Sequence, residues 1–132
     1  MNVVETEWWT MALPPEWWAE SEDDSVLVGD RDEVGCIEIS TLCKEEGEFD
    51  VATVRKIAQE SSDQAQSWRT AELGAFNGVF AGSLEQGVAL REWYVAAGQL
   101  LLFITYSCDE DNGGMDDAAV DAILDTLQPA VR

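Results

Sequence analysis

The chain has 132 residues, and 7 Lys and Arg against 27 Asp and Glu, with no His, give a formal net charge of −20 at pH 7. This length fits one domain, and a hydrophobic content of 46% is enough for a core. So few cations cannot form the basic stripe that phosphates require, which excludes nucleic acid and anionic membranes as expected partners, and the lack of His excludes Ser-His-Asp and Cys-His catalysis.

The first predicted elements are strands. Residues 8–13 are aromatic and apolar and stop at two prolines, which cannot continue a ladder, so they predict a strand. Trp17 and Trp18 are expected in a turn or a short extended piece. Residues 26–28 and 36–41 are strand-like and are separated by an acidic, turn-rich loop, which predicts a hairpin.

A helix and a run of strands follow. Asp50 is a good N-cap for a helix that begins at Val51 and ends near residues 61–63. The next forty residues predict an antiparallel meander. Its strands are expected at residues 68–73, 79–85, 88–96 and 99–107, and its turns at Asn77-Gly78, Gln86-Gly87 and Ala97-Gly98. Both faces of the last strand are apolar, so it is predicted to be central and covered on both sides.

A second helix is expected to close the chain, from about residue 117 to residue 128. Its apolar positions 120, 123, 124 and 127 have the spacing of an amphipathic stripe. The element order is then β-β-β-α-β-β-β-β-α. This order predicts a single α+β domain over residues 1–132, with an antiparallel sheet of about six to seven strands flanked by two main helices.

The three cysteines, Cys36, Cys43 and Cys108, are an odd number without a CxxC spacing. They predict reduced thiols rather than a disulfide framework or a Cys-only zinc site. Cys36 and Cys108 are expected to be small buried apolar residues, whereas Cys43 stands beside Lys44, whose charge would favour a thiolate. We expect inert thiols, no metal, no cofactor and no enzyme activity.

The localisation expected from the sequence is cytoplasmic. The first seven residues are acidic, whereas a signal peptide begins with basic residues. The longest compact apolar run covers residues 100–104, far short of the ~20 residues that a membrane-spanning helix needs.

Three segments carry a resemblance to the PsbP-like superfamily. Residues 9–18, WTMALPPEWW, resemble its opening motif, residues 87–106 resemble its paired central strands, and residues 120–127 resemble its closing helix. The resemblance implies an antiparallel sheet with flanking helices and non-catalytic protein binding. The superfamily includes DcrB-like lipoproteins, a Ran-binding nuclear-import factor and chaperones of type VI secretion effectors. Because the chain lacks a signal peptide and a lipobox cysteine, the resemblance implies a cytosolic member.

Paired tryptophans suggest where a partner would bind. Successive side chains of a strand point to opposite faces, so Trp8 and Trp9 cannot both enter one core unless the strand is covered on both sides. Either another element covers the second face, or an aromatic patch ringed by acid stays exposed for a partner. The predicted protein-binding residues are Trp8, Trp17, Trp18, Trp93, Glu20, Glu22, Asp23 and Asp24.

The charge is uneven along the sequence, at −13 for residues 1–50, −1 for residues 51–107 and −6 for residues 108–132. The first functional hypothesis is a non-enzymatic adaptor or effector chaperone that grips a polypeptide, such as a secreted effector, on an apolar surface. The alternative is an acidic immunity protein that neutralises a basic toxin, in which the charge itself is the site. A third is a halophile-type acidic surface of unknown role. A homodimer is compatible with all three.

Overall fold

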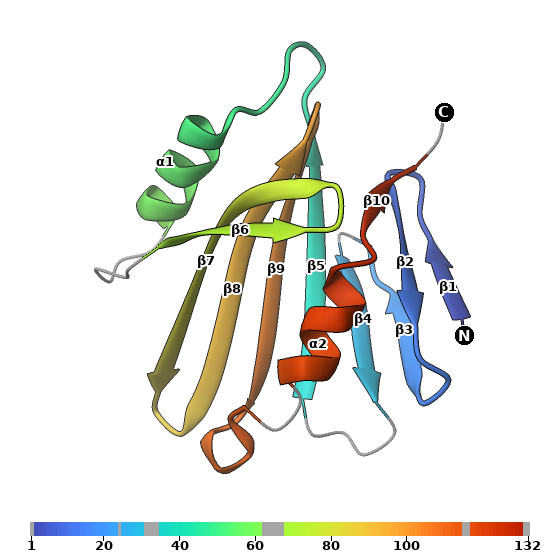
Figure 1. Cartoon of the computed structure of the whole chain (residues 1–132), viewed down its shortest axis with the longest axis vertical. Coiled ribbons are helices and arrows are strands. Elements are labelled where there is room, and N and C mark those ends of the chain that lie inside the picture. The colour runs from blue at the N-terminus through green and yellow to red at the C-terminus, as the bar shows by residue number, and fades with distance from the viewer. Residues whose placement is uncertain (1, 24, 31–34, 62–67, 115–116, 131–132) are drawn as a thin grey trace.

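The computed structural model describes residues 2–23, 25–30, 35–61, 68–114 and 117–130, which form an α+β domain (Figure 1). The strands are β1 Asn2–Glu5, β2 Trp9–Leu13, β3 Trp17–Ser21, β4 Ser25–Asp30, β5 Gly35–Cys43, β6 Arg69–Leu73, β7 Phe76–Glu85, β8 Val88–Ala97, β9 Leu100–Asp109 and β10 Gln128–Pro129. The helices are α1 Val51–Ser61, the 3-10 helix η1 Glu110–Asn112 and α2 Asp117–Leu124.

Two antiparallel sheets organise these strands. The large sheet has seven strands in the order β3-β4-β5-β9-β8-β7-β6, and the small sheet has three in the order β1-β2-β10. The predicted α+β class, the antiparallel sheet and the two main helices are confirmed. Three strands, β1, β3 and β10, are additions to the expected order. The small sheet joins the two ends of the described chain, because β1 and β10 pair with opposite edges of β2.

The main core lies between one face of the large sheet, the small sheet and α2. Ile39 of β5 and Leu102 of β9 belong to the same buried cluster as Met11 of β2 and Ile123 of α2. Figure 1 shows α2 in front of the large sheet, with the small sheet beside it. The buried residues of α2 follow the predicted amphipathic stripe.

The opposite face of the large sheet carries α1. Val54 and Ala58 of this helix are fully buried in a second cluster, together with Val79 and Tyr94 of the sheet. Asp50 caps the helix as predicted, since its Oδ1 accepts a hydrogen bond from the Thr53 N–H at 2.7 Å. This hydrogen bond to the charged carboxylate lowers the pKa of Asp50 below its ordinary value. The described residues contain no helix long and apolar enough to cross a bilayer.

Strand β9 takes the central place predicted for it, between β5 and β8. On one face Leu102, Ile104 and Tyr106 are buried in the main core, and on the other face Leu101 is buried in the α1 cluster. The second face is covered only in part, because Thr105 stays half-buried.

One predicted turn was wrong. Asn77-Gly78 lies inside β7, and the chain reverses instead at Gly74-Ala75, where Gly74 has φ +60°. Gly78 serves a different purpose, because a Cβ atom added to it would overlap the carbonyl oxygen of Tyr94 on the neighbouring strand. The turn at Gln86-Gly87 is confirmed.

The second helix also ends earlier than predicted, at Leu124 rather than near residue 128. Thr126 holds the chain in place just after the end of α2. Its hydroxyl donates to the Ile123 carbonyl at 2.6 Å and accepts from the Ala12 N–H at 2.9 Å. These bonds tie the end of α2 to β2. The chain then continues through the buried Leu127 into β10.

Candidate functional site

Two of the predicted aromatic residues, Trp17 and Trp93, lie in the core. Trp17 is 7% exposed and Trp93 is 3% exposed, and both belong to the main cluster. The prediction that they present an aromatic surface is therefore wrong. The physical reason is that both side chains point to the face of the large sheet that carries α2 and the small sheet.

Trp18 and Glu20 point to the other face of β3. Trp18 is 41% exposed, and its ring covers Gly29, whose added Cβ would stand 2.7 Å from the ring. Its indole N–H donates to the Asp30 carbonyl at 3.2 Å. Trp18 therefore packs on its own sheet, and it and the exposed Glu20 do not join the other predicted residues in one site.

Three predicted residues do come together, in a pocket of about 390 Å³ between the β1–β2 turn and the β3–β4 turn. They are Trp8, Glu22 and Asp23. We call this feature the acidic pocket; its lining is Thr6, Glu7, Trp8, Trp9, Ser21, Glu22, Asp23, Ser25, Val26, Ile39 and Thr41. Asp24, also predicted, lies outside the described residues.

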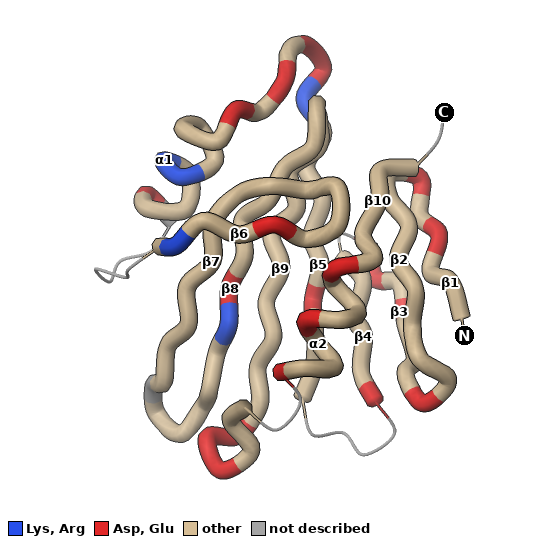
Figure 2. The backbone as a smooth tube through the Cα atoms, viewed as in Figure 1, with Lys and Arg blue, Asp and Glu red and all other residues tan. Residues whose placement is uncertain are grey.

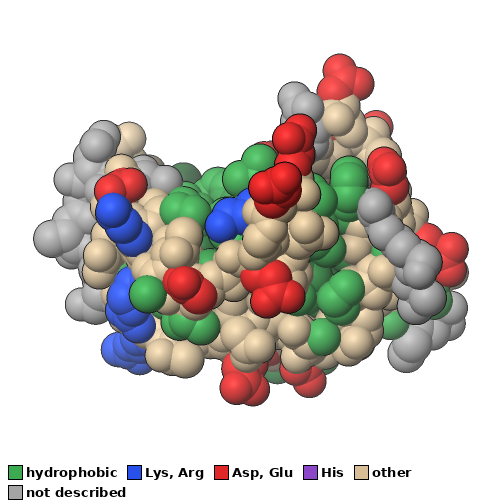
Figure 3. Space-filling model, turned by 90° about the horizontal axis from the view of Figure 1, so that it is seen from above, with side chains coloured by type: hydrophobic (Ala, Val, Ile, Leu, Met, Phe, Trp, Pro, Cys, Tyr) green, Lys and Arg blue, Asp and Glu red, His purple; other side chains and the backbone are tan. Residues whose placement is uncertain are grey.

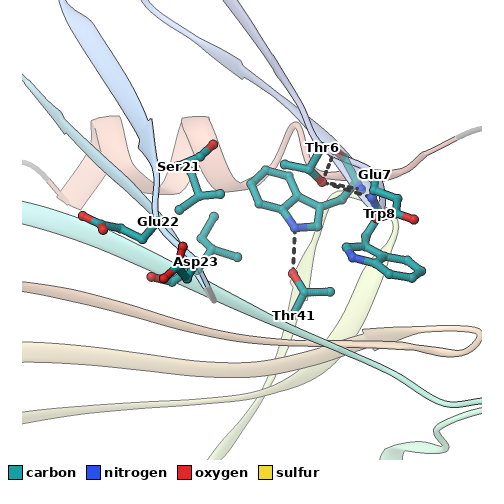
Figure 4. Close-up of a pocket in the computed structure, with 11 residues that line it drawn as sticks. Thr6, Glu7, Trp8, Ser21, Glu22, Asp23 and Thr41 are labelled. Carbon is teal, nitrogen blue, oxygen red and sulfur yellow. Dashed lines mark hydrogen bonds between the residues drawn. The ribbon is translucent and has the colours of Figure 1, made fainter.

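Thr6 shapes one wall of the acidic pocket. Its Oγ1 accepts hydrogen bonds from the N–H groups of Trp8 at 3.1 Å and Trp9 at 2.9 Å, and its hydroxyl donates to the Trp9 carbonyl. The Trp9 indole turns inward and is 1% exposed, and its N–H donates to Thr41 Oγ1 at 3.0 Å (Figure 4). Trp8, which points the other way from the strand, stays half-buried.

The β3–β4 turn forms the other wall. The Glu22 N–H donates to the Ser25 carbonyl at 2.8 Å, which closes the turn. Glu22 and Asp23 are exposed, and Figure 4 shows their side chains across the pocket from Glu7 and Trp8. Acidic residues from two distant parts of the sequence therefore line one pocket, although the carboxylates of Glu7 and Glu22 point outward from its two sides (Figure 4).

The electrostatics of the acidic pocket are one-sided. Its described lining includes the three carboxylates of Glu7, Glu22 and Asp23 and no Lys or Arg, which gives a local charge of −3. Apolar side chains of Val26 and Ile39 lie below them. A Lys or Arg side chain combines the two properties required here, because it has an apolar stem and a cationic head that also interacts with indole faces.

Acidic residues are also uneven over the whole fold (Figure 2). They gather on β1, in the turns and along α2, whereas Lys and Arg lie on α1, β6, β8 and beyond the end of β5. Among the described residues, no three His, Cys, Asp or Glu side chains are grouped as metal ligands.

Sequence reasoning missed Thr6, Glu7 and Thr41. Glu7 directly precedes Trp8, and this acidic-aromatic pair was the available signal. Thr41 had none, because its role depends on the register of β5 with β9, which places it on the inward face opposite Leu102.

All three cysteines are free thiols. Cys108 is buried as predicted, whereas Cys36 and Cys43 are half-buried. Burial and, to a lesser extent, the negative charge of Glu38 raise the pKa of Cys36 above its ordinary value, against the lowering effect of a hydrogen bond with the Val28 backbone. Both raising effects disfavour the thiolate.

We therefore expect Cys36 to react slowly. In a Cys43→Ser chain, iodoacetamide should alkylate Cys36 more slowly than free cysteine at pH 8, with the rate rising only at higher pH. Glu38→Gln should shift this pH profile downward, and the distant Glu45→Gln should not. A Cys36 as reactive as free cysteine at pH 8 would contradict the expectation.

No family model and no curated protein matches the sequence. Among solved structures, the fold is similar to that of a protein from Bacteroides thetaiotaomicron VPI-5482, with a TM-score of 0.73 and 18% identity over 95% of this chain. The chain spans about half of that protein, 46% of its length. It is also similar to LpqN, a protein involved in cell envelope biogenesis of Mycobacterium tuberculosis, with a TM-score of 0.61, 16% identity and coverage of 93% of this chain and 83% of LpqN. At these identities the likeness shows the fold alone.

Proposed function

We propose that this chain is a non-enzymatic protein-binding domain that recognises a basic side chain of its partner in the acidic pocket. The observation that carries the proposal is the pocket itself, which Trp8 and the three acidic residues Glu7, Glu22 and Asp23 line together. We include membership of the PsbP-like superfamily in this proposal. The sequence motifs and the antiparallel sheet with two flanking helices support it.

The burial of Trp17 and Trp93 bears on whether the partner is bound through apolar contacts or through charged ones. A chaperone that grips apolar segments through an aromatic patch needs those rings at the surface. The acidic pocket instead favours a partner with a basic surface, such as a toxin or a basic effector. Charge complementarity of this kind steers association, which slows as salt rises.

The proposal predicts that N-acetyl-argininamide, as the simplest probe, binds in the acidic pocket. We expect a saturable shift of the Trp9 indole N–H signal in NMR spectra, because this group lies at the pocket floor beside Thr41. Changing Glu22→Gln and Asp23→Asn together should weaken binding about tenfold, since two exposed ion pairs together contribute about 1.4 kcal/mol.

The matched control removes the same charge elsewhere. Glu45→Gln with Glu46→Gln changes two exposed acids of the turn after β5, which do not line the pocket. This pair should leave the affinity within twofold. Equal weakening by both pairs, or no shift of the Trp9 signal, would reject the pocket as the site and leave only general attraction to an acidic protein.

A further inference from the structure

A second concave surface lies on the other side of α2 from the small sheet. Two hollows of about 450 and 320 Å³ adjoin here and share Phe80 and Arg91. We call them together the α2 groove; its lining includes Ala71, Glu72, Leu73, Phe80, Gly82, Leu84, Ala89, Arg91, Trp93, Cys108, Asp117, Asp121 and Asp125. In Figure 3 a hollow with a hydrophobic floor opens along the upper part of the view, with acidic side chains beside it.

Gly82 lies on the groove floor, and neither a bulge nor a close contact within the described chain requires a glycine at this position. A glycine inside a strand commonly marks a bulge or the close approach of another group. The register of β7 with β8 runs without interruption from Asn77 to Glu85, which excludes a bulge. A Cβ atom added to Gly82 would meet only ordinary contacts at 3.8 Å, unlike one added to Gly78, so packing within the described chain does not require this glycine. The missing side chain leaves room on the groove floor.

The floor is apolar and partly exposed beside Gly82. Leu84 is 66% exposed, and Phe80 and Ala89 are half-buried. Strand β7 pairs with β6 only as far as Phe80, so none of the described strands pairs with the outer edge of β7 beyond this point. An apolar segment lying here would therefore cover both the floor and the strand edge.

Arg91 shows what kind of group this wall binds. Its guanidinium carbon lies 5.2 Å from the Phe80 ring centre and 4.7 Å from the Trp93 ring centre. Its Nη2 contacts Asp121 at 2.7 Å and its Nη1 lies 3.5 Å from Asp117. The groove thus already holds one basic side chain of the protein itself between aromatic rings and carboxylates of α2.

The groove keeps an excess of negative charge after this pairing. Glu72, Asp117 and Asp121 of α2 and Asp125 just beyond it, against the one Arg, give the lining a charge of −3. Asp117 and Asp121 lie four residues apart on α2, about 6 Å along its axis. Asp125 follows in the turn directly after the helix, where its N–H donates to the Asp121 carbonyl at 3.0 Å. Alternate side chains of an extended chain are about 6.8 Å apart. The two repeats match closely over a short segment.

We propose that the α2 groove binds an extended segment of a partner polypeptide in which apolar and basic residues alternate. The apolar side chains lie on the floor over Gly82, and the Lys or Arg side chains reach the acidic rim of α2. This inference rests on the proposed function, since it describes a segment of the same basic partner, but it uses a separate surface. A second copy of this acidic chain does not supply the required positive charge.

The test uses the whole protein and the peptide acetyl-Ser-Leu-Lys-Leu-Lys-Leu-Ser-amide, with binding measured by calorimetry and amide shifts mapped by NMR. Gly82→Val fills the floor with a residue that strands favour, and its Cβ atom would meet only ordinary contacts at 3.8 Å. It should weaken binding at least tenfold. Ser107→Val adds a similar side chain to the opposite face of the large sheet, beside Cys36, and should keep the affinity within twofold.

A second set of measurements tests whether binding requires opposite charges on the groove and the peptide. Asp125→Asn with Glu72→Gln should weaken binding several-fold, and the same peptide with Glu in place of Lys should not bind. The pair Glu22→Gln and Asp23→Asn should leave this peptide's affinity unchanged, so failure of the acidic pocket and failure of the groove give different results.

Four outcomes would overturn the groove assignment. These are equal affinity for wild type and Gly82→Val, no binding of the Leu-Lys peptide at 1 mM, equal binding of the Glu peptide, and a wild-type dimer that Gly82→Val dissociates. The last would make a second copy the occupant.

Discussion

Replacing Trp93 by Ala is expected to lower the free energy of unfolding by about 3–5 kcal/mol. The side chain is 3% exposed in the main core and lies 5.3 Å, centre to centre, from the Phe80 ring. Its removal leaves a cavity and takes away one of the two rings against which Arg91 stacks. Urea unfolding followed by circular dichroism should show a lower midpoint with little change in slope.

The matched change Trp93→Phe keeps an aromatic ring beneath Arg91 and should cost about 1–2 kcal/mol. The two variants also separate the core role of Trp93 from the surface role expected from the sequence. A Trp93→Ala protein of wild-type stability would contradict the burial that the structure shows.

Replacing Gly74 by Ala is expected to destabilise the protein far more than replacing Gly98 by Ala. Both glycines have positive φ, +60° and +57°, so an Ala at either position carries a similar backbone cost of about 1–2 kcal/mol. A Cβ atom at Gly98 meets nothing within 4 Å, whereas one at Gly74 overlaps the Leu127 carbonyl oxygen. The same carbonyl accepts the Ala75 N–H at 3.0 Å.

We therefore expect a total loss of about 3 kcal/mol or more for Gly74→Ala, because backbone atoms must move to relieve the overlap. Thermal unfolding of the two variants under the same conditions measures the difference. Equal melting temperatures would mean that the contact between the β6–β7 turn and the segment before β10 contributes nothing to stability.

Local signals in the sequence were enough for much of the fold. The Asp50 cap, the stripe of α2 and the two apolar faces of β9 each depend on residues close together in the chain, and the structure has all three. Asn77-Gly78 shows where a local signal fails. The dipeptide favours a turn, but the close approach of β7 and β8 requires a residue without a Cβ at position 78, and this contact is invisible in the sequence.

The candidate site was only partly predictable for a related reason. Trp8, Glu22 and Asp23 were recognised as an aromatic residue and acids in separate segments, but nothing in the sequence placed them around one cavity with Thr41. Trp17 and Trp93 were wrongly predicted to be exposed. Alternation along a strand shows that successive side chains point to opposite faces of the sheet, but it does not show which face other elements cover. The coverage depends on α2 and on a small sheet whose third strand has two residues and carries no sequence signal of its own.

That third strand has a consequence for the order of folding. Strand β2 pairs with β10 through Thr10 with Gln128 and Trp9 with Pro129, so two segments far apart in the sequence must meet. During synthesis β2 emerges well before its partner β10 and before the helix that covers its core residues. Contacts so far apart in sequence slow folding, and apolar surface awaiting its cover is prone to aggregate. The strongly negative charge of the N-terminal segments would then act before the native state exists, by keeping unfinished chains apart.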